Sequence, residues 1–139
     1  MRYVVLDTNI LVSRLLASKD SVPAQAVTRV FVQGGQPLFS EATFAELQTV
    51  LSRPKFDPYI SREKRKYFLS EMRELSAFIT ITRRITLCRD TADDKFLDVS
   101  VNGKADYLIT GDQDLLILQS IENIPILSPS DFLKQHLPS

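Results

Sequence analysis

The sequence predicts an α/β fold in which a parallel sheet is covered by helices on both faces. Short apolar runs alternate along the chain with longer segments of helical periodicity, which is the pattern of an α/β domain. Within these runs apolar and polar residues do not strictly alternate, as is typical of strands buried on both faces. Because the 139 residues contain no linker or repeat, we expect one domain over residues 1–139.

Five strands and six helices account for most of the chain. The strands are predicted at Tyr3–Leu6, Pro37–Phe39, Ile79–Thr82, Tyr107–Ile109 and Ile124–Ile126. The first two helices are predicted near residues 9–17 and 23–33, the second ended by Gly34 and Gly35. The next two begin after Ser40 and near Ser61, and a fifth spans about 93–102. The stretch SPSDFLKQHL predicts a last short helix with Ser128 or Ser130 as its N-cap.

Charge is unevenly distributed along a chain whose formal net charge is zero. Residues 53–89 carry ten Lys/Arg against four Asp/Glu, and the remainder carries seven against thirteen. Such asymmetry is typical of a protein with an anionic partner. The alternative is a solvated helix face, because SREKRKYFLSEMRELSAF is plainly amphipathic.

The scarcity of cysteine and histidine excludes several kinds of site. Cys88 and His136 are the only residues of their types, so neither a disulfide framework, a Cys/His zinc site nor a His-based triad can form. No apolar run approaches the roughly 20 residues that cross a bilayer. The first residues lack the pattern of a secretory signal. We therefore expect a cytoplasmic protein with no membrane partner.

Four acidic residues occupy positions where a doubly wound sheet binds ligands. Asp7 ends the first strand and Asp112 follows the fourth, while Glu46 and Asp94 lie in the third and fifth helices. Gathered carboxylates repel one another and therefore need a counterion. Their oxygen atoms favour Mg²⁺ or Mn²⁺, so metal-activated water is the expected nucleophile of an enzyme with this site.

Each acid also has a simpler explanation. Asp7, Asp94 and Asp112 could stabilise the starts of helices, although Glu46 in mid-helix could not. Asp98 lies one turn after Asp94 and is expected to support the site, and Asp114 is the nearest rival to Asp112. We expect Asp112, not Asp114, to be the fourth principal acid.

Four stretches of the chain resemble the PIN domain family of metal-dependent ribonucleases, which includes the VapC-type toxins of toxin–antitoxin pairs. They are VVLDTNILVSRLL, FSEATFAELQTVLSRPKF, CRDTADDKFLDVSVNGKADYLITGDQDLL and IPILSPSDFL. The resemblance implies a three-layer α/β/α fold with a five-stranded parallel sheet of order 3-2-1-4-5. The pattern departs from the family at Thr91 and Ala92, where proline and a further acid are more usual.

The resemblance also implies the roles of the site residues. Asp7, Glu46, Asp94 and Asp112 would be catalytic, and Asp7, Asp94 and Asp112 would hold one or two Mg²⁺ or Mn²⁺ ions. Glu46 would be a further ligand or would orient the attacking water. The supporting polar residues would be Asn9, Ser40, Thr110, Asp98 and Asp114.

The implied function is hydrolysis of RNA phosphodiester bonds by a toxin, with an antitoxin protein as partner and a homo-oligomeric assembly. The expected basic rim for RNA consists of Arg53, Lys55, Arg62, Lys64, Arg65 and Lys66. An aspartyl phosphatase would need an acid where Asn9 stands, and a receiver domain would need an acceptor aspartate where Thr82 and Arg83 stand. The alternative that stays open is a catalytically silent PIN fold that binds RNA or protein.

Overall fold

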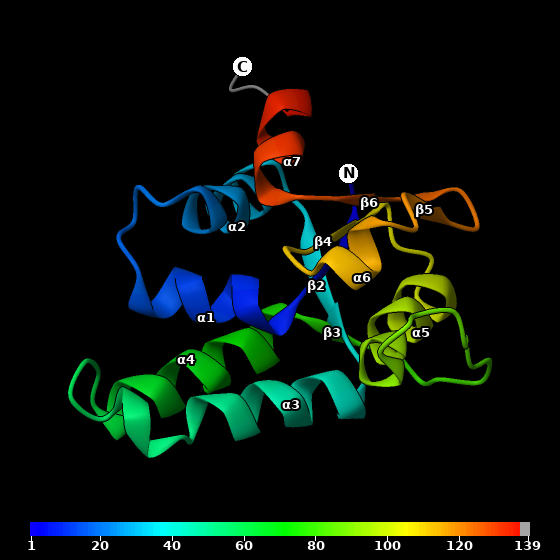
Figure 1. The fold of residues 1–139 in the computed structure, drawn as a ribbon. Helices are drawn as coiled ribbons and strands as arrows, with labels where there is room; N and C mark the ends of the chain where they lie inside the picture. Colours follow the sequence, from blue (N-terminus) through cyan, green and yellow to red (C-terminus); the bar gives the residue numbers. More distant parts are fainter. Residues whose placement is uncertain (137–139) are drawn as a thin grey trace.

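The protein is a sheet between two layers of helices (Figure 1), described by a computed structural model over residues 1–136. The strand order is β3-β2-β1-β4-β6-β5, and only β5 is antiparallel to its neighbour. The strands are β1 (Tyr3–Leu6), β2 (Gln36–Phe39), β3 (Ala77–Phe78), β4 (Tyr107–Ile109), β5 (Ser120–Ile121) and β6 (Ile124–Leu127).

Helices of unequal number cover the two faces of the sheet. One face packs against α1 (Thr8–Leu16), α2 (Val22–Val32), α3 (Glu41–Leu51), α4 (Arg62–Leu75) and α7 (Pro129–Gln135). The other packs against α5 (Asp94–Asn102) and α6 (Gln113–Leu116). Short 3₁₀ turns at Pro54–Phe56 and Thr91–Asp93 precede α4 and α5. None of the helices in residues 1–136 is both long and apolar enough to cross a membrane.

The predicted three-layer α/β/α class is confirmed, and the strand order differs from the prediction by one added strand. The five parallel strands lie side by side in the predicted order, and the two-residue β5 extends the sheet beyond β6. The prediction of a third strand at Ile79–Thr82 is wrong, because β3 is Ala77–Phe78. After the Ile79 N–H bonds the Phe39 carbonyl, the chain leaves the sheet for a loop that α5 side chains hold.

Several helix ends confirm the predicted signals. The hydroxyls of Ser40, Ser61 and Ser128 each accept a backbone N–H in the first turn of α3, α4 and α7. Ser128 rather than Ser130 is thus the last N-cap, and Leu137 of the predicted stretch lies outside the described residues. Gly34 ends α2 with a φ of 79°, a left-handed conformation that glycine adopts without steric cost.

The two faces of β1 show why the first strand leads directly to a site. Val4 and Leu6 enter the core beneath α1–α4, and Val5 enters the core beneath α5. The strand is therefore apolar throughout, and the first polar residue stands at its carboxyl end. There the Asp7 N–H bonds the Ile109 carbonyl at 3.0 Å, which places the ends of β1 and β4 side by side.

Candidate metal centre

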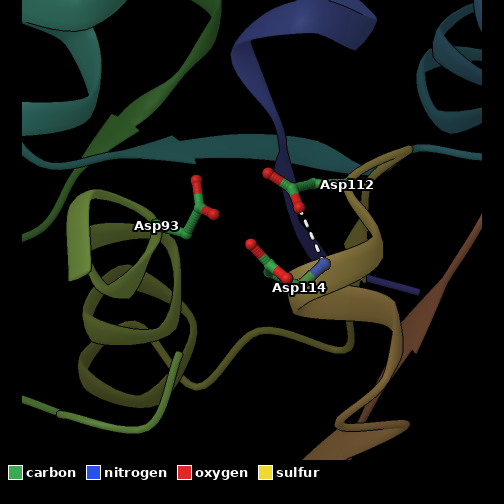
Figure 2. A group of neighbouring side chains, drawn as sticks. All are labelled: Asp93, Asp112 and Asp114. Carbon is green, nitrogen blue, oxygen red and sulfur yellow. Dashed lines mark hydrogen bonds between the residues drawn. The ribbon is translucent and has the colours of Figure 1, made fainter. Parts of the chain in front are cut away.

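Three carboxylates converge beyond the carboxyl ends of β1 and β4. Asp93 ends the 3₁₀ turn before α5, Asp112 precedes α6, and Asp114 lies in the first turn of α6. One carboxylate oxygen from each lies within 4.8 Å of the other two. Figure 2 shows the three side chains pointing toward one another across the space between α5 and α6. The Asp114 N–H donates to Asp112 Oδ1 at 2.8 Å, which fixes the Asp112 side chain as the N-cap of α6.

Asp93 is the least satisfied of these acids. Its Oδ2 is buried and has no hydrogen-bond partner in residues 1–136. Burial, followed by the adjacent Asp112 carboxyl and the charges of Asp90 and Asp7, raises the pKa of Asp93 to about 7. A buried carboxylate oxygen without a donor needs either a proton or a cation. Asp114 has a partial counterion, because Arg89 pairs with it at 3.0 Å from an exposed position.

Asp7 is connected to this group through Thr110. The Thr110 hydroxyl donates to Asp7 Oδ2 at 2.6 Å and accepts the Asp112 N–H at 3.0 Å. Burial raises the pKa of Asp7 in spite of that hydrogen bond, and the charges of Glu46 and Asp112 raise it further. Asp7 is also the N-cap of α1, since its Oδ1 accepts the Asn9 N–H at 3.3 Å. Asp7 therefore both caps α1 and lies next to the converging acids.

Glu46 has a counterion of its own. Its Oε1 pairs with Lys95 Nζ at 2.9 Å, and its Oε2 accepts the Thr8 hydroxyl. Both side chains of the ion pair are largely buried, with exposed fractions of 32% for Glu46 and 21% for Lys95. Glu46 thus lies beside Asp7 but is neutralised within the protein, unlike Asp93.

The chemistry of these donors fits a divalent cation. Oxygen atoms on opposite sides of a Mg²⁺ ion are about 4.2 Å apart, so the spacing of the three carboxylates needs little adjustment to hold one. All of the donors are oxygens, which favours Mg²⁺ or Mn²⁺ over zinc. Burial raises the pKa of the Cys88 thiol to about 12, with Asp94 adding to the shift, so without a bound ion the thiol stays protonated and is a poor nucleophile.

The structure places Asp94, predicted as a metal ligand, outside the group of converging acids and its neighbour Asp93 inside it. Asp94 Oδ1 accepts the N–H groups of Leu87 and Cys88 at 3.2 and 2.8 Å, and Asp94 is not one of the three converging acids. Burial acts to raise the pKa of Asp94, but these N–H donors hold it below its ordinary value. Because the helix begins only after Asp93, Asp94 faces the loop before α5 and Asp93 faces the cluster.

Asp98 and Ser40, predicted as supporting residues, have structural partners instead. Asp98 Oδ1 accepts the Ile85 N–H at 2.6 Å, one helical turn beyond Asp94. Ser40 forms a reciprocal capping box with Thr43 at the start of α3. Asn9 is exposed next to Asp7, and it contacts that carboxylate through its backbone N–H. Thr110, also predicted as a supporting residue, bonds both Asp7 and the backbone of Asp112.

One residue of the predicted basic rim, Arg65, is buried in the structure. Arg65 is 3% exposed, and its guanidinium donates to the carbonyls of Leu51 and Arg53 and pairs with Asp57 at 2.5 Å. It closes the carboxyl end of α3 and cannot contact RNA, because its donors are occupied within the fold. The other five residues of the set are exposed and lie at the carboxyl end of α3 and the start of α4; they are Arg53, Lys55, Arg62, Lys64 and Lys66.

The sequence alone singles out neither Asp93 nor Lys95. Asp93 stands next to the predicted Asp94, and the adjacent pair of acids is the signal that could have pointed to it. No sequence signal pairs Lys95 with Glu46, because the contact joins α5 to α3 across 49 residues.

Comparisons with known proteins agree with this geometry. A family model described as PIN domain matches residues 3–114. An uncharacterized protein of Methanocaldococcus jannaschii is 28% identical over 95% of this chain and 90% of its own length. Among solved structures, VapBC2 from Rickettsia felis, bound to a DNA fragment from its promoter, matches with a TM-score of 0.60 and 17% identity, covering 92% of this chain and 98% of its own.

A second solved structure, the PIN domain endonuclease Utp24, matches with a TM-score of 0.55 and 22% identity, covering 91% of this chain and 84% of its own. At these identities the solved structures establish the fold. The family model reaches from β1 to Asp114 and so spans all of the converging carboxylates. The chain belongs to the PIN domain family.

Proposed function

We propose that this protein is a metal-dependent endoribonuclease that hydrolyses RNA phosphodiester bonds. The observation that carries the proposal is the convergence of three carboxylate oxygens within 4.8 Å, together with the buried and unpartnered Oδ2 of the half-buried Asp93. Membership of the PIN domain family supports nuclease chemistry at this place in the fold. One of the structural neighbours, Utp24, is an endonuclease, which agrees with the proposal.

The residues divide into those that would hold the ion and those that position the rest. Asp93, Asp112 and Asp114 would hold one Mg²⁺ or Mn²⁺ ion, with Asp7 available to it or to a second ion through its position beside Thr110. A bound divalent ion supplies Lewis acidity and a water molecule of lowered pKa.

The protein's own groups then orient the substrate and accept protons. Thr110 fixes the Asp7 carboxylate against the Asp112 backbone, so the two acids keep a constant relation to the scissile phosphate. Burial raises the pKa of Asp7, so its carboxylate would be a stronger base toward the attacking water than an exposed aspartate. Lys95, held by Glu46, adds the positive charge that an anionic substrate requires at an acidic site.

The biological role we propose is that of the toxin in a toxin–antitoxin pair, cytoplasmic and assembled as a homo-oligomer with an antitoxin protein. The supporting observation is the likeness in fold to VapBC2, which covers nearly the whole of both chains. The exposed basic residues that follow α3 are proposed to approach the RNA backbone. The alternative is a PIN fold that binds RNA or protein without cleaving it.

Cleavage of a 5′-labelled single-stranded RNA by the purified protein tests the enzymatic proposal. We expect Mn²⁺ or Mg²⁺ to support cleavage, EDTA to abolish it, and Asp112→Asn to lack it under all conditions, because one ion ligand becomes a neutral amide. A matched single-stranded DNA determines whether ribose is required. RNA binding without cleavage in any of these metals would favour the silent module, and activity that survives EDTA would point to a contaminating nuclease.

A further inference from the structure

A groove of about 890 Å³ lies beside the acidic site, and Lys95 is the one residue of its lining that the proposed chemistry uses. Its walls come from the first half of α3, the end of α4, β3 with the loop that follows, and α5. Figure 1 shows β3 leaving the end of α4 in the direction of α5. The side chains that matter for its chemistry are Phe44, Phe78, Arg73, Arg84 and Lys95.

Three cationic and two acidic side chains line the groove. Neither Arg73 nor Arg84 forms an ion pair with a carboxylate in residues 1–136, and both are exposed. The groove also contains Glu41 and Asp98, but the Asp98 carboxylate is buried and accepts the Ile85 N–H. Two free guanidinium groups therefore face a groove in which Glu41 is the one exposed acid. Such a lining suits an anion, and guanidinium groups in particular suit phosphate.

An aromatic ring is exposed within the same groove. Phe78 is 39% exposed, although apolar side chains of this size are usually buried. Its ring lies 5.9 Å from Phe39 and 5.3 Å from Phe44, both of which are buried, so it is held rigidly from behind. The Arg73 guanidinium lies 4.5 Å from the Phe44 ring centre and 5.1 Å from that of Phe78. An exposed ring that packs on other rings, beside guanidinium groups that no carboxylate neutralises, is an arrangement that proteins use to bind single-stranded nucleic acids.

Lys95 joins the groove to the metal centre. It lines the groove, and its Nζ pairs with Glu46 Oε1 at 2.9 Å. Glu46 in turn accepts the hydroxyl of Thr8, the residue that follows Asp7. Lys95 also lies two residues after Asp93 in the turn that enters α5. A nucleotide in the groove would thus be adjacent to a phosphate at the carboxylates.

We infer that this groove binds the RNA nucleotide next to the scissile phosphate, with Phe78 stacked on its base and Arg73 and Arg84 on its phosphate. The inference rests on the proposed ribonuclease function and adds the substrate subsite to it. It requires an unpaired base, since a base within a duplex is already stacked on its neighbours. The substrate is therefore single-stranded at the cleavage position. The exposed basic residues after α3 would contact backbone farther along the strand.

Binding of a short fluorescein-labelled single-stranded RNA in EDTA, followed by fluorescence anisotropy, tests the subsite without cleavage. We expect Phe78→Ala to weaken binding about tenfold, and Phe78→Trp to preserve it because indole also stacks. Arg84→Gln should lower the slope of log affinity against log salt by about 0.7, as expected for one lost phosphate contact on a single strand. The control is Lys19→Gln, which removes one exposed charge from the loop between α1 and α2 and should change neither quantity.

The outcomes separate this inference from the function on which it rests. If the wild type cleaves RNA but Phe78→Ala and Arg84→Gln bind and cleave it normally, the groove is not the subsite and the ribonuclease proposal survives. If these variants bind weakly while the wild type cleaves nothing in Mn²⁺, the groove is supported and the ribonuclease proposal fails. Weakened binding from Lys64→Gln and Lys66→Gln alone would place the strand on the basic residues after α3 and overturn the inference.

Discussion

Two groups of acids meet at the start of α5, and they differ in what surrounds their carboxylates. Asp93 faces Asp112 and Asp114, and one of its oxygens has no donor in the described part of the chain. Asp94, the next residue, accepts two backbone N–H groups from residues 87 and 88. The carboxyl pKa values move accordingly, up to about 7 for Asp93 and below the ordinary range for Asp94.

The second group extends along α5 at intervals of one helical turn. Asp94, Asp98 and Asn102 project from the same face of the helix, because residues four apart are neighbours on its surface. Asp98 accepts the Ile85 N–H, and the Asn102 amide bonds the backbone of residues 82 and 83. Together these three side chains replace the sheet hydrogen bonds that the loop of residues 79–90 lacks.

The difference shows how a single helix end can serve structure and chemistry at once. Backbone donors satisfy Asp94 and Asp98, which thereby stabilise the loop that carries Arg84 and Arg89. Asp93 is left with an unsatisfied oxygen, which either a proton or a bound cation would stabilise. An acidic residue in this segment is thus a candidate ligand only if the fold withholds hydrogen-bond donors from it.

The largest effect we predict is the difference in RNA cleavage rate between Asp93→Asn and Asp94→Asn. We expect Asp93→Asn to lower Mn²⁺-dependent RNA cleavage about 100-fold or more, because it removes a charged ion ligand. Asp94→Asn keeps an oxygen for the Leu87 and Cys88 N–H groups and should lose less than about tenfold. Initial cleavage rates of the purified variants give the comparison.

Thermal unfolding with and without Mn²⁺ supplies the control for this pair. Mn²⁺ should raise the unfolding temperature of the wild type and of Asp94→Asn, and that gain should shrink for Asp93→Asn. A variant at position 94 that cleaves RNA no better than Asp93→Asn, while folded, would restore Asp94 as the ligand and contradict the geometry.

For stability we expect the opposite order, with alanine at position 94 more damaging than alanine at position 93. Asp94→Ala leaves two backbone N–H groups without their charged acceptor at a buried position, and we expect a loss of about 2 kcal/mol in the free energy of unfolding. Asp93→Ala leaves no backbone N–H without its acceptor and relieves repulsion with Asp112 and Asp7, so metal-free stability should stay the same or rise slightly. Urea denaturation in EDTA measures both. Equal losses at the two positions would mean that the carboxylates are not differently supported.

The sequence predicts the fold more completely than the site. Apolar runs located the four longer strands, and serine N-caps located the starts of α3, α4 and α7, because these signals depend on a few consecutive residues. β3 was misplaced because an edge strand of two residues has almost no pattern of its own. The antiparallel β5, equally short, was missed for the same reason.

The choice between Asp93 and Asp94 depends on a helix boundary, which sequence patterns locate only to within a residue or two. Adjacent positions on a helix point about 100° apart, so an error of one residue exchanges an acid that faces the cluster for one that faces the loop.

Arg65 shows a second limit of prediction from sequence, which is that distant partners decide whether a residue is buried. Its neighbours in the sequence are exposed cations, and only the position of the Leu51 and Arg53 carbonyls reveals why it is buried. Such long-range partners leave no trace in local composition.

The smallest effect we predict is a difference in pH dependence between the two acids in metal-free protein. Asp93 has a raised pKa in the folded state, so the unfolded chain releases that proton at lower pH than the folded protein does. Its contribution to stability therefore falls as pH rises from about 4 to about 7 and is constant above 7. Asp94 has a lowered pKa, so its contribution is present above the ordinary carboxyl pKa and is lost as pH falls through the folded value.

Unfolding free energies of the wild type, Asp93→Asn and Asp94→Asn, measured in EDTA across this range, check the two signs. Asp93→Asn should equal the wild type near pH 4 and become the more stable of the two as pH approaches 7, because the amide avoids the charge that burial and Asp112 oppose. Asp94→Asn should be less stable than the wild type by a constant amount above pH 5, and the gap should narrow in acid. The three proteins share every other titrating group, so subtraction removes the contribution of the groups that do not interact with Asp93 or Asp94. Parallel curves for the two variants would show that Asp93 is already satisfied without a cation, and the candidate metal centre would lose its principal physical support.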